Sequence, residues 1–259
     1  MGLKYPFGEA GVRKLLTIAF VLHAAAALAA APDDDHLIPE DSDFTRADLP
    51  DGATLLGPYY AMVISALKDA FAPDVRARVI AMPSFTPEYA VGIKEDDGAF
   101  AIFHLALDAQ MWRYDMLRSL REVPPEVLPE DERGRLNEAI GDLQGSLPQD
   151  FRDVGVARCE IAIDPDLGRA LLRIWSGMLL RTHYGNAGRL GPDGTDYHFS
   201  MAGDLQYLAG KVWNPPAESE TGRFIRLADT MKSLCVTGDR NLLAQLQPQV
   251  DRLLVELVR

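Results

Sequence analysis

The sequence predicts an α+β fold in which a mainly antiparallel sheet packs with several amphipathic helices in a single domain. Short strand-like segments are mixed with segments whose apolar residues recur every three or four positions, without the steady strand and helix alternation of a parallel sheet. The chain has 259 residues, 47% of them hydrophobic, which is enough for one substantial core. We find no internal repeat or low-complexity linker that would divide it.

Residues 1–29 have the pattern of a cleavable signal peptide. Lys4, Arg13 and Lys14 precede an uncharged run from Leu15 to Ala31, which is short for a membrane anchor. Small residues favour cleavage after Ala29, and the alternative cut after Ala31 would leave a proline directly behind it. We therefore expect a periplasmic protein, exported by this signal and not inserted in the membrane after cleavage.

The acidic and proline-rich residues 30–53 are predicted to form an extended arm before the α+β domain of residues 54–259. Gly57-Pro58 is typical of a helix start, and an apolar stripe continues to Phe71 before Ala72-Pro73. Strand patterns cover residues 78–82, 89–94, 100–107, 154–163, 195–200 and 208–213. The segment 95–98 indicates a hairpin, and residues 100–107, apolar on both faces, predict an interior strand.

Five further helices are predicted, the first two over residues 112–121 and 129–144. A third begins at Pro165 behind an Asp164 cap, and a fourth is capped by Thr221. The fifth runs from Asp239 and should be interrupted or kinked at Pro248.

The overall charge narrows the classes of partner. The chain has 26 Lys and Arg against 38 Asp and Glu, a net charge of -12, and removal of residues 1–29 makes it -14. Nucleic acids and anionic membranes are bound through basic side chains, so both are excluded as partners. Basic proteins, cations and neutral molecules remain.

Two cysteines, Cys159 and Cys235, would share an oxidising compartment after export. An even pair predicts one disulfide, which would close a long loop. Two separate buried thiols are the alternative, because spacing does not show that the side chains meet. A nucleophilic cysteine is disfavoured, since neither has a recognisable catalytic neighbourhood.

The densest polar segment is the candidate binding region, with Trp213 as a further contact residue beside a rigid Asn-Pro-Pro turn. Its predicted binding residues are Arg181, His183, Asp196, His198 and Ser200. Alternation places Asp196, His198 and Ser200 on one strand face, but parallel side chains two residues apart do not converge as a catalytic triad requires. The face is therefore interpreted as a hydrogen-bonded surface or a ligand-binding face.

Common catalytic motifs are absent from the sequence, and we assign no catalytic residue, metal ligand or cofactor. His183 and His198 could share a metal, but no third ligand has a predictable place. Glu88 would be a catalytic acid if it were buried, although a strand-entry role suits its proline-rich loop better. His104 is interpreted as a hydrogen-bonded core histidine.

Four segments, residues 83–93, 178–184, 194–200 and 214–229, together resemble exported proteins of Gram-negative bacteria that have no assigned activity. The similarity spans most of residues 83–235 and includes both cysteines. The resemblance implies a periplasmic localisation and a disulfide between Cys159 and Cys235. It identifies no functional residue in this chain.

These observations favour an exported acidic binding protein without catalytic activity, whose partner is another, basic protein. An immunity protein that inhibits an antibacterial effector acting in the periplasm is one such protein. The alternatives are a periplasmic hydrolase with a site near Arg181, Asp196 and His198, and a module that binds a small molecule or the cell wall.

Overall fold

A computed structural model describes residues 36–40, 57–184, 193–203 and 207–257 of the chain. The chain divides into two compact units, Met1–Asp34 and Asp35–Arg259, and only the second contains described residues. The predicted signal peptide, most of the acidic arm and the glycine-rich loop after Tyr184 lie outside the described residues.

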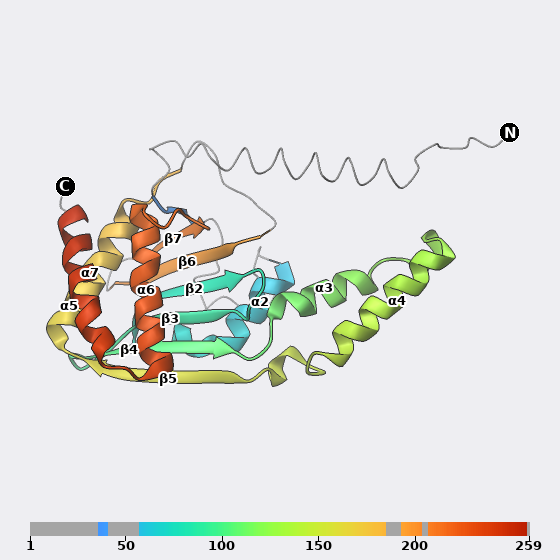
Figure 1. The fold of residues 1–259 in the computed structure, drawn as a ribbon, viewed down its shortest axis with the longest axis horizontal. Coiled ribbons are helices and arrows are strands. Elements are labelled where there is room, and N and C mark those ends of the chain that lie inside the picture. The colour runs from blue at the N-terminus through green and yellow to red at the C-terminus, as the bar shows by residue number, and fades with distance from the viewer. Residues whose placement is uncertain (1–35, 41–56, 185–192, 204–206, 258–259) are drawn as a thin grey trace. The chain divides into compact units, whose positions relative to one another are not determined.

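The described strands form one antiparallel sheet in the order β1-β7-β6-β2-β3-β4-β5 (Figure 1). Their bounds are β1 Ile38–Pro39, β2 Val75–Pro83, β3 Tyr89–Asp96, β4 Ala99–Leu107, β5 Val156–Ile163, β6 Thr195–Ala202 and β7 Tyr207–Trp213. The predicted α+β class and antiparallel sheet are confirmed. The strand expected at 100–107 is also interior, because β4 lies between β3 and β5.

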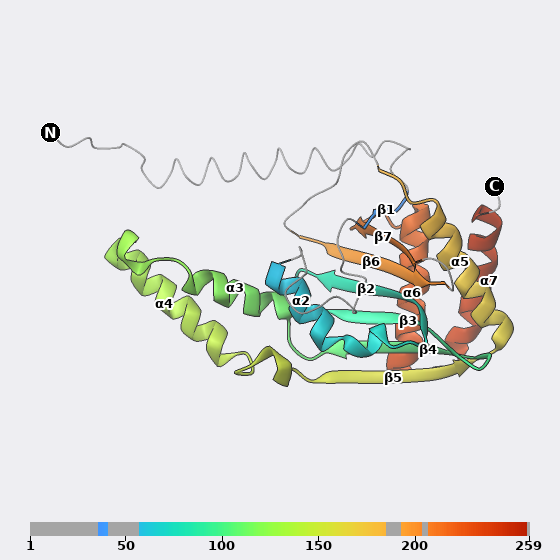
Figure 2. The same ribbon diagram turned by 180° about the vertical axis from the view of Figure 1, so that it is seen from behind.

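Helices cover both faces of this sheet (Figure 2). One face packs against α5 Pro165–Leu180 and α6 Glu220–Thr237, on which α7 Asn241–Leu257 packs in turn, and the other packs against α2 Gly57–Ala66 and the short 3-10 helix Lys68–Phe71. Two more helices, α3 Met111–Arg121 and α4 Glu130–Gly145, follow β4, with α3 in contact with α2. Short 3-10 turns cover Pro125–Val127 and Phe151–Asp153.

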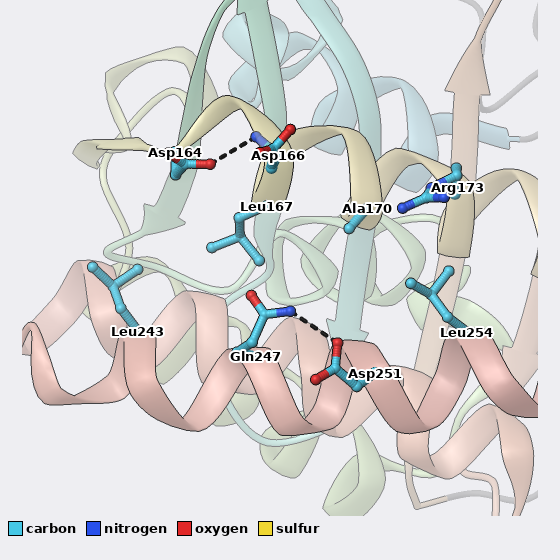
Figure 3. A pocket seen from close by; sticks show the side chains of 9 residues that line it. All are labelled: Asp164, Asp166, Leu167, Ala170, Arg173, Leu243, Gln247, Asp251 and Leu254. Carbon is cyan, nitrogen blue, oxygen red and sulfur yellow. Dashed lines mark hydrogen bonds between the residues drawn. The ribbon is translucent and has the colours of Figure 1, made fainter.

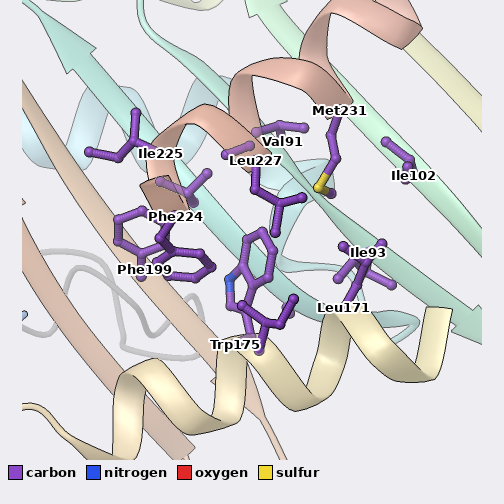
Figure 4. Packing of buried hydrophobic residues seen from close by; sticks show 14 of the residues in the cluster. Val91, Ile93, Ile102, Leu171, Trp175, Phe199, Phe224, Ile225, Leu227 and Met231 are labelled. Carbon is purple, nitrogen blue, oxygen red and sulfur yellow. The ribbon is translucent and has the colours of Figure 1, made fainter. Parts of the chain in front are cut away.

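The larger core lies between the sheet and helices α5, α6 and α7 (Figure 4). At its centre the Phe224 ring stacks on Phe199, with ring centroids 4.4 Å apart, and meets Trp175 edge-on at 4.6 Å. The Trp175 indole N–H donates to the Arg78 carbonyl oxygen at 3.3 Å. This bond satisfies the one polar group of a fully buried side chain and ties α5 to the middle of the sheet.

The predicted hairpin joins β3 and β4. Asp97 and Gly98 have φ angles of 47° and 81°, which a two-residue turn with left-handed backbone requires. The adjoining strands keep a regular register from Asp96 opposite Ala99 to Tyr89 opposite Ala106. This register places Tyr89, Val91 and Ile93 on the face covered by α6.

Several local predictions need correction. The helix expected from Gly57 to Phe71 ends at Ala66 and continues as a separate 3-10 turn. The strand expected from Val154 begins at Val156. Within the predicted extended arm, Ile38–Pro39 form strand β1, which pairs with β7, and Leu37 is buried.

Two helix features also differ from the predictions. Ser219, rather than Thr221, caps α6, since its hydroxyl accepts from the Gly222 N–H at 2.9 Å. The C-terminal helix, expected to be interrupted or kinked at Pro248, is not interrupted there, and Pro248 is exposed. Solvent can satisfy the backbone carbonyl that a proline leaves without its helical donor, so the helix continues.

A disulfide joins Cys159 on β5 to Cys235 on α6, with Cα atoms 5.6 Å apart. The predicted pairing is confirmed. Such a bond is typical of an oxidising compartment. Among the described helices, none has the length and apolar character needed to cross a membrane.

Candidate functional site

The side chains of strand β6 alternate between the two faces of the sheet. Tyr197 and Phe199 belong to the core under α5 and α6, whereas Asp196, His198 and Ser200 lie on the face toward α2, as alternation predicts. The expectation of a surface was wrong for two of them, because His198 and Ser200 are only 2% and 1% exposed. The strand is interior, and β2 and β7 flank it on both sides.

The polar residues grouped with His198 are Glu40 and Lys211, and neither was among the predicted binding residues. Its Nδ1 contacts Glu40 Oε2, and both side chains are almost fully buried. Lys211 of β7 places Nζ 3.8 Å from the other Glu40 oxygen, and the ring of Tyr60 meets the imidazole edge-on. The buried carboxylate thus has an imidazole and an ammonium group as partners, an arrangement that offsets the free-energy penalty of burying a charge.

Asp196 and Trp213 face one another across β6 and β7. Burial raises the pKa of Asp196, while His198 and Lys211 oppose the rise. The Trp213 indole closes over Gly194, where a β-carbon would lie 2.8 Å from the ring. Gly194 is held in turn by the backbone N–H of Ser84, which donates to its carbonyl oxygen at 2.9 Å. Trp213 therefore packs on a loop.

Arg181 and His183 lie at the end of α5 and make different contacts. Arg181 pairs with Glu220 at 3.0 Å and donates to the Leu257 carbonyl oxygen at 2.8 Å, so it links α5 to α6 and α7. The ring of His183 stacks on His36, with centroids 3.3 Å apart. The structure therefore brings together Asp196 and His198, with Trp213 beside Asp196, and places the Arg181 contacts at the helices covering the opposite face of the sheet.

Glu88 is buried, and its carboxylate accepts three hydrogen bonds. The Tyr59 hydroxyl donates at 2.8 Å, and the backbone N–H groups of Met111 and Trp112 donate at 2.9 and 3.2 Å. The two amides are the first of α3, where a helix has N–H groups without helical acceptors and a positive dipole end. Glu88 thus caps α3 from the entry of β3, which favours a structural role over acid catalysis.

A second polar cluster lies between α6 and the sheet, and no sequence pattern predicted its members as a group. The Tyr89 hydroxyl lies 3.4 Å from Asp229 Oδ1, Lys232 Nζ lies 3.7 Å from the Tyr89 ring centroid, and the ring of His104 meets Tyr89 edge-on at 5.8 Å. Burial lowers the pKa of Lys232 and raises that of Asp229. The i and i+3 spacing of Asp229 and Lys232 was the available signal, but their sheet partners are remote in sequence.

His104 differs from the hydrogen-bonded core histidine that was expected. It is 5% exposed, and its Nε2 has no hydrogen-bond partner among the described residues. Burial, together with nearby Lys232, lowers its pKa to about 4. The imidazole is therefore neutral at pH 7.

A groove between α5 and α7 combines acidic and apolar side chains (Figure 3). Its volume is about 410 Å³, and it is lined by Asp164, Asp166, Leu167, Ala170, Arg173, Leu243, Gln247, Asp251 and Leu254. Asp164 caps α5 through the Asp166 N–H at 2.8 Å, and Gln247 donates to Asp251 at 2.9 Å. Three carboxylates against one guanidinium give the groove a net negative charge.

No family model, curated protein or solved structure matches the chain. Within the described parts of the chain, no three His, Cys, Asp or Glu side chains are grouped closely enough to hold a metal ion. A functional proposal therefore depends on the net charge of the chain, the buried polar clusters and the acidic groove between α5 and α7.

Proposed function

We propose that this is an exported, acidic binding protein of the periplasm that captures a basic protein, and that the groove between α5 and α7 receives a cationic amphipathic segment of that partner. The groove supports this proposal because its lining combines three carboxylates, Asp164, Asp166 and Asp251, and one arginine with the apolar side chains of Leu167, Leu243 and Leu254. Leucine side chains would accept the apolar face of a helix, and the aspartates would pair with lysine or arginine at its margins.

The net charge of the whole chain also favours a basic protein as the partner. The whole chain carries a net charge of -12. A strongly acidic protein attracts a basic one over distances comparable with the Debye length, about 10 Å at 0.1 M salt. Long-range attraction accelerates encounter, and the groove would provide the close contacts that slow dissociation. An inhibitor of a basic effector in the same compartment is the narrower form of this proposal.

A pair of designed peptides tests the proposal. The probe is an amphipathic helical peptide of leucine and lysine, and its control replaces every lysine with glutamate. Fluorescence anisotropy should show binding of the cationic peptide only, with an association rate that falls as salt rises and a dissociation rate that changes less. Equal binding of the acidic peptide, or no binding of the cationic one, would refute the proposed groove.

Charge-reversing variants locate the binding surface. Asp166→Lys combined with Asp251→Lys changes two groove carboxylates without removing the Asp164 cap of α5. We expect at least a tenfold weaker complex, because two charge pairs become repulsive. The matched control, Asp131→Lys with Glu138→Lys, makes the same charge change on exposed positions of α4. Equal losses in both variants would mean that overall charge, and not the groove, determines binding.

A further inference from the structure

The strands at the two edges of the sheet differ in their capacity to pair with a further strand. At one edge, β1 is only two residues long and ends in Pro39, both of which limit further strand pairing. At the other edge, β5 has eight residues, contains no proline and pairs with β4 in an unbroken register. Its outer side lies along the margin of the sheet, and none of the described strands pairs with it (Figures 1 and 2).

Alternation identifies the backbone groups that β5 presents outward. The Asp108 N–H donates to the Gly155 carbonyl oxygen at 3.1 Å, so the backbone of Gly155 faces β4. The N–H and C=O groups of Val156, Arg158, Glu160 and Ala162 therefore point away from β4. Arg158 Nη1 donates to the outward Val156 carbonyl at 2.9 Å. A new strand would replace this one side-chain contact with a backbone donor.

The charges on β5 favour one register for its antiparallel pairing with a second copy. In an antiparallel pair centred on Cys159, Arg158 lies opposite Glu160 of the second copy and Val156 lies opposite Ala162 of the second copy. A centre at Arg158 or Glu160 would instead place that charge opposite its own copy, which is unfavourable. We propose that the outer edge of β5 pairs in this register with β5 of a second copy of this chain, forming a two-fold symmetric dimer with one continuous sheet.

The present contacts of these side chains permit the rearrangement. Arg158 pairs with Asp69 at 2.8 Å and Glu160 pairs with Lys94 at 3.0 Å, and both β5 side chains are 55% exposed. Ion pairs this exposed are weak and readily exchanged. Next to them a groove of about 500 Å³, with Phe103 and Leu105 in its wall, follows β4 and β5. The dimer would bring the corresponding grooves of both copies to the new strand pair.

The other face of the paired strands would be apolar. Ala157 would lie opposite Ile161 of the second copy, and Cys159 would lie beside the two-fold axis with its disulfide to Cys235 intact. Val236, the next residue of α6, is 66% exposed in the single chain. An isologous interface of this kind is closed, because each copy contributes the same edge, the outer side of β5, and so it ends at the dimer.

Sedimentation equilibrium of the oxidised protein over a concentration series tests the proposal. Arg158→Glu or Glu160→Arg alone places like charges opposite each other twice in the dimer, and each should raise the dimer dissociation constant by about tenfold or more. The double variant Arg158→Glu with Glu160→Arg restores opposite charges and should return the constant to near the wild-type value. Arg135→Glu on exposed α4 makes the same charge change as Arg158→Glu and should leave the constant unchanged.

Ala162→Pro provides a variant that does not depend on charge. The Ala162 N–H points outward, so proline there should remove a donor from the dimer without removing one from the pairing of β5 with β4. We expect a folded monomer, with the far-ultraviolet circular dichroism of the wild type. A wild-type chain that is monomeric at all concentrations would overturn the proposal, as would a dimer that the single charge variants leave unchanged. The groove variants between α5 and α7 should still dimerise, which separates this test from that of the proposed function.

Discussion

Glu88 shows how one buried side chain can position three elements. It lies at the entry of β3, and its carboxylate accepts from Tyr59 of α2 and from the first two amides of α3. A carboxylate at the N-terminus of a helix is favoured by the helix dipole. The contacts of Glu88 therefore connect α2 and α3 to one corner of the sheet.

We expect Glu88→Ala to destabilise the fold by about 2 to 4 kcal/mol, because three donors lose their acceptor in a buried place. Urea unfolding of the oxidised protein measures the change. Glu88→Gln keeps an acceptor oxygen and should lose less stability than Glu88→Ala. Equal, small losses in both variants would contradict the capping role.

His104 makes the stability of the fold depend on pH. Burial and Lys232 lower its folded pKa to about 4, whereas an unfolded histidine titrates near pH 6.5. Between these values the unfolded chain binds a proton that the folded chain does not, so stability falls as pH falls through this window. The neighbouring ionisable groups are Tyr89 of β3 and Lys232 of α6.

We expect the contribution of His104 to this loss to be on the order of 1 to 2 kcal/mol, after allowing for solvent screening near Lys232. Unfolding free energies measured from pH 7 to pH 4 for the wild type and His104→Phe isolate the effect, since all other groups are shared. The variant should show the shallower decline. A parallel decline in both proteins would show that His104 does not contribute.

At the scale of the element, two glycines inside helices have opposite surroundings. A β-carbon on Gly168 of α5 would lie 2.3 Å from the buried ring of Phe100, whereas one on Gly141 of α4 would meet nothing within 4 Å. Helix propensity alone favours alanine over glycine by about 1 kcal/mol at either position. In α5, the contact of position 168 with β4 therefore determines whether alanine stabilises or destabilises the fold.

We expect Gly141→Ala to stabilise the protein by about 0.5 to 1 kcal/mol and Gly168→Ala to destabilise it by about 1 to 3 kcal/mol, through overpacking. Thermal and urea unfolding of the two variants provide the comparison, and each serves as the control for the other. Stabilisation of both would mean that α5 can move away from β4 without loss of packing.

At the scale of the whole molecule, the disulfide connects the edge strand to α6 across 76 residues of sequence. Closing a loop of this length restricts the unfolded chain and, in the entropic description, stabilises the fold by about 4 kcal/mol. We expect Cys159→Ala combined with Cys235→Ala to lose most of this amount in urea unfolding. The wild type under reducing conditions should lose a similar amount. A double variant as stable as the oxidised wild type would contradict this account.

Patterns among neighbouring residues were sufficient to predict most of the helices and strands. The Asp164 cap, the two-residue hairpin turn and the apolar stripe of α5 depend on residues close together in the sequence, and each is confirmed. The cap of α6 was misplaced by two residues because Ser219 and Thr221 both suit a cap. Which hydroxyl reaches the Gly222 amide depends on the backbone path.

The grouping of the polar residues could not be predicted in the same way. Alternation on β6 correctly placed Asp196 and His198 on one face, but their burial depends on β6 being interior. Glu40 is 158 positions from His198 in the sequence, and Asp229 is 140 positions from Tyr89. No periodicity over a few residues carries information about such pairs.

The sequence by itself therefore determined the class of fold, the antiparallel hairpin, most helix starts and the pairing of the only two cysteines, because these follow from local backbone preferences, periodicity and a count of two. Only the tertiary structure decided the strand order, the capping role of Glu88, the neutral state of His104 and the acidic groove between α5 and α7. Each of these depends on which faces of distant segments pack together, since packing removes water from some polar side chains and supplies others with partners.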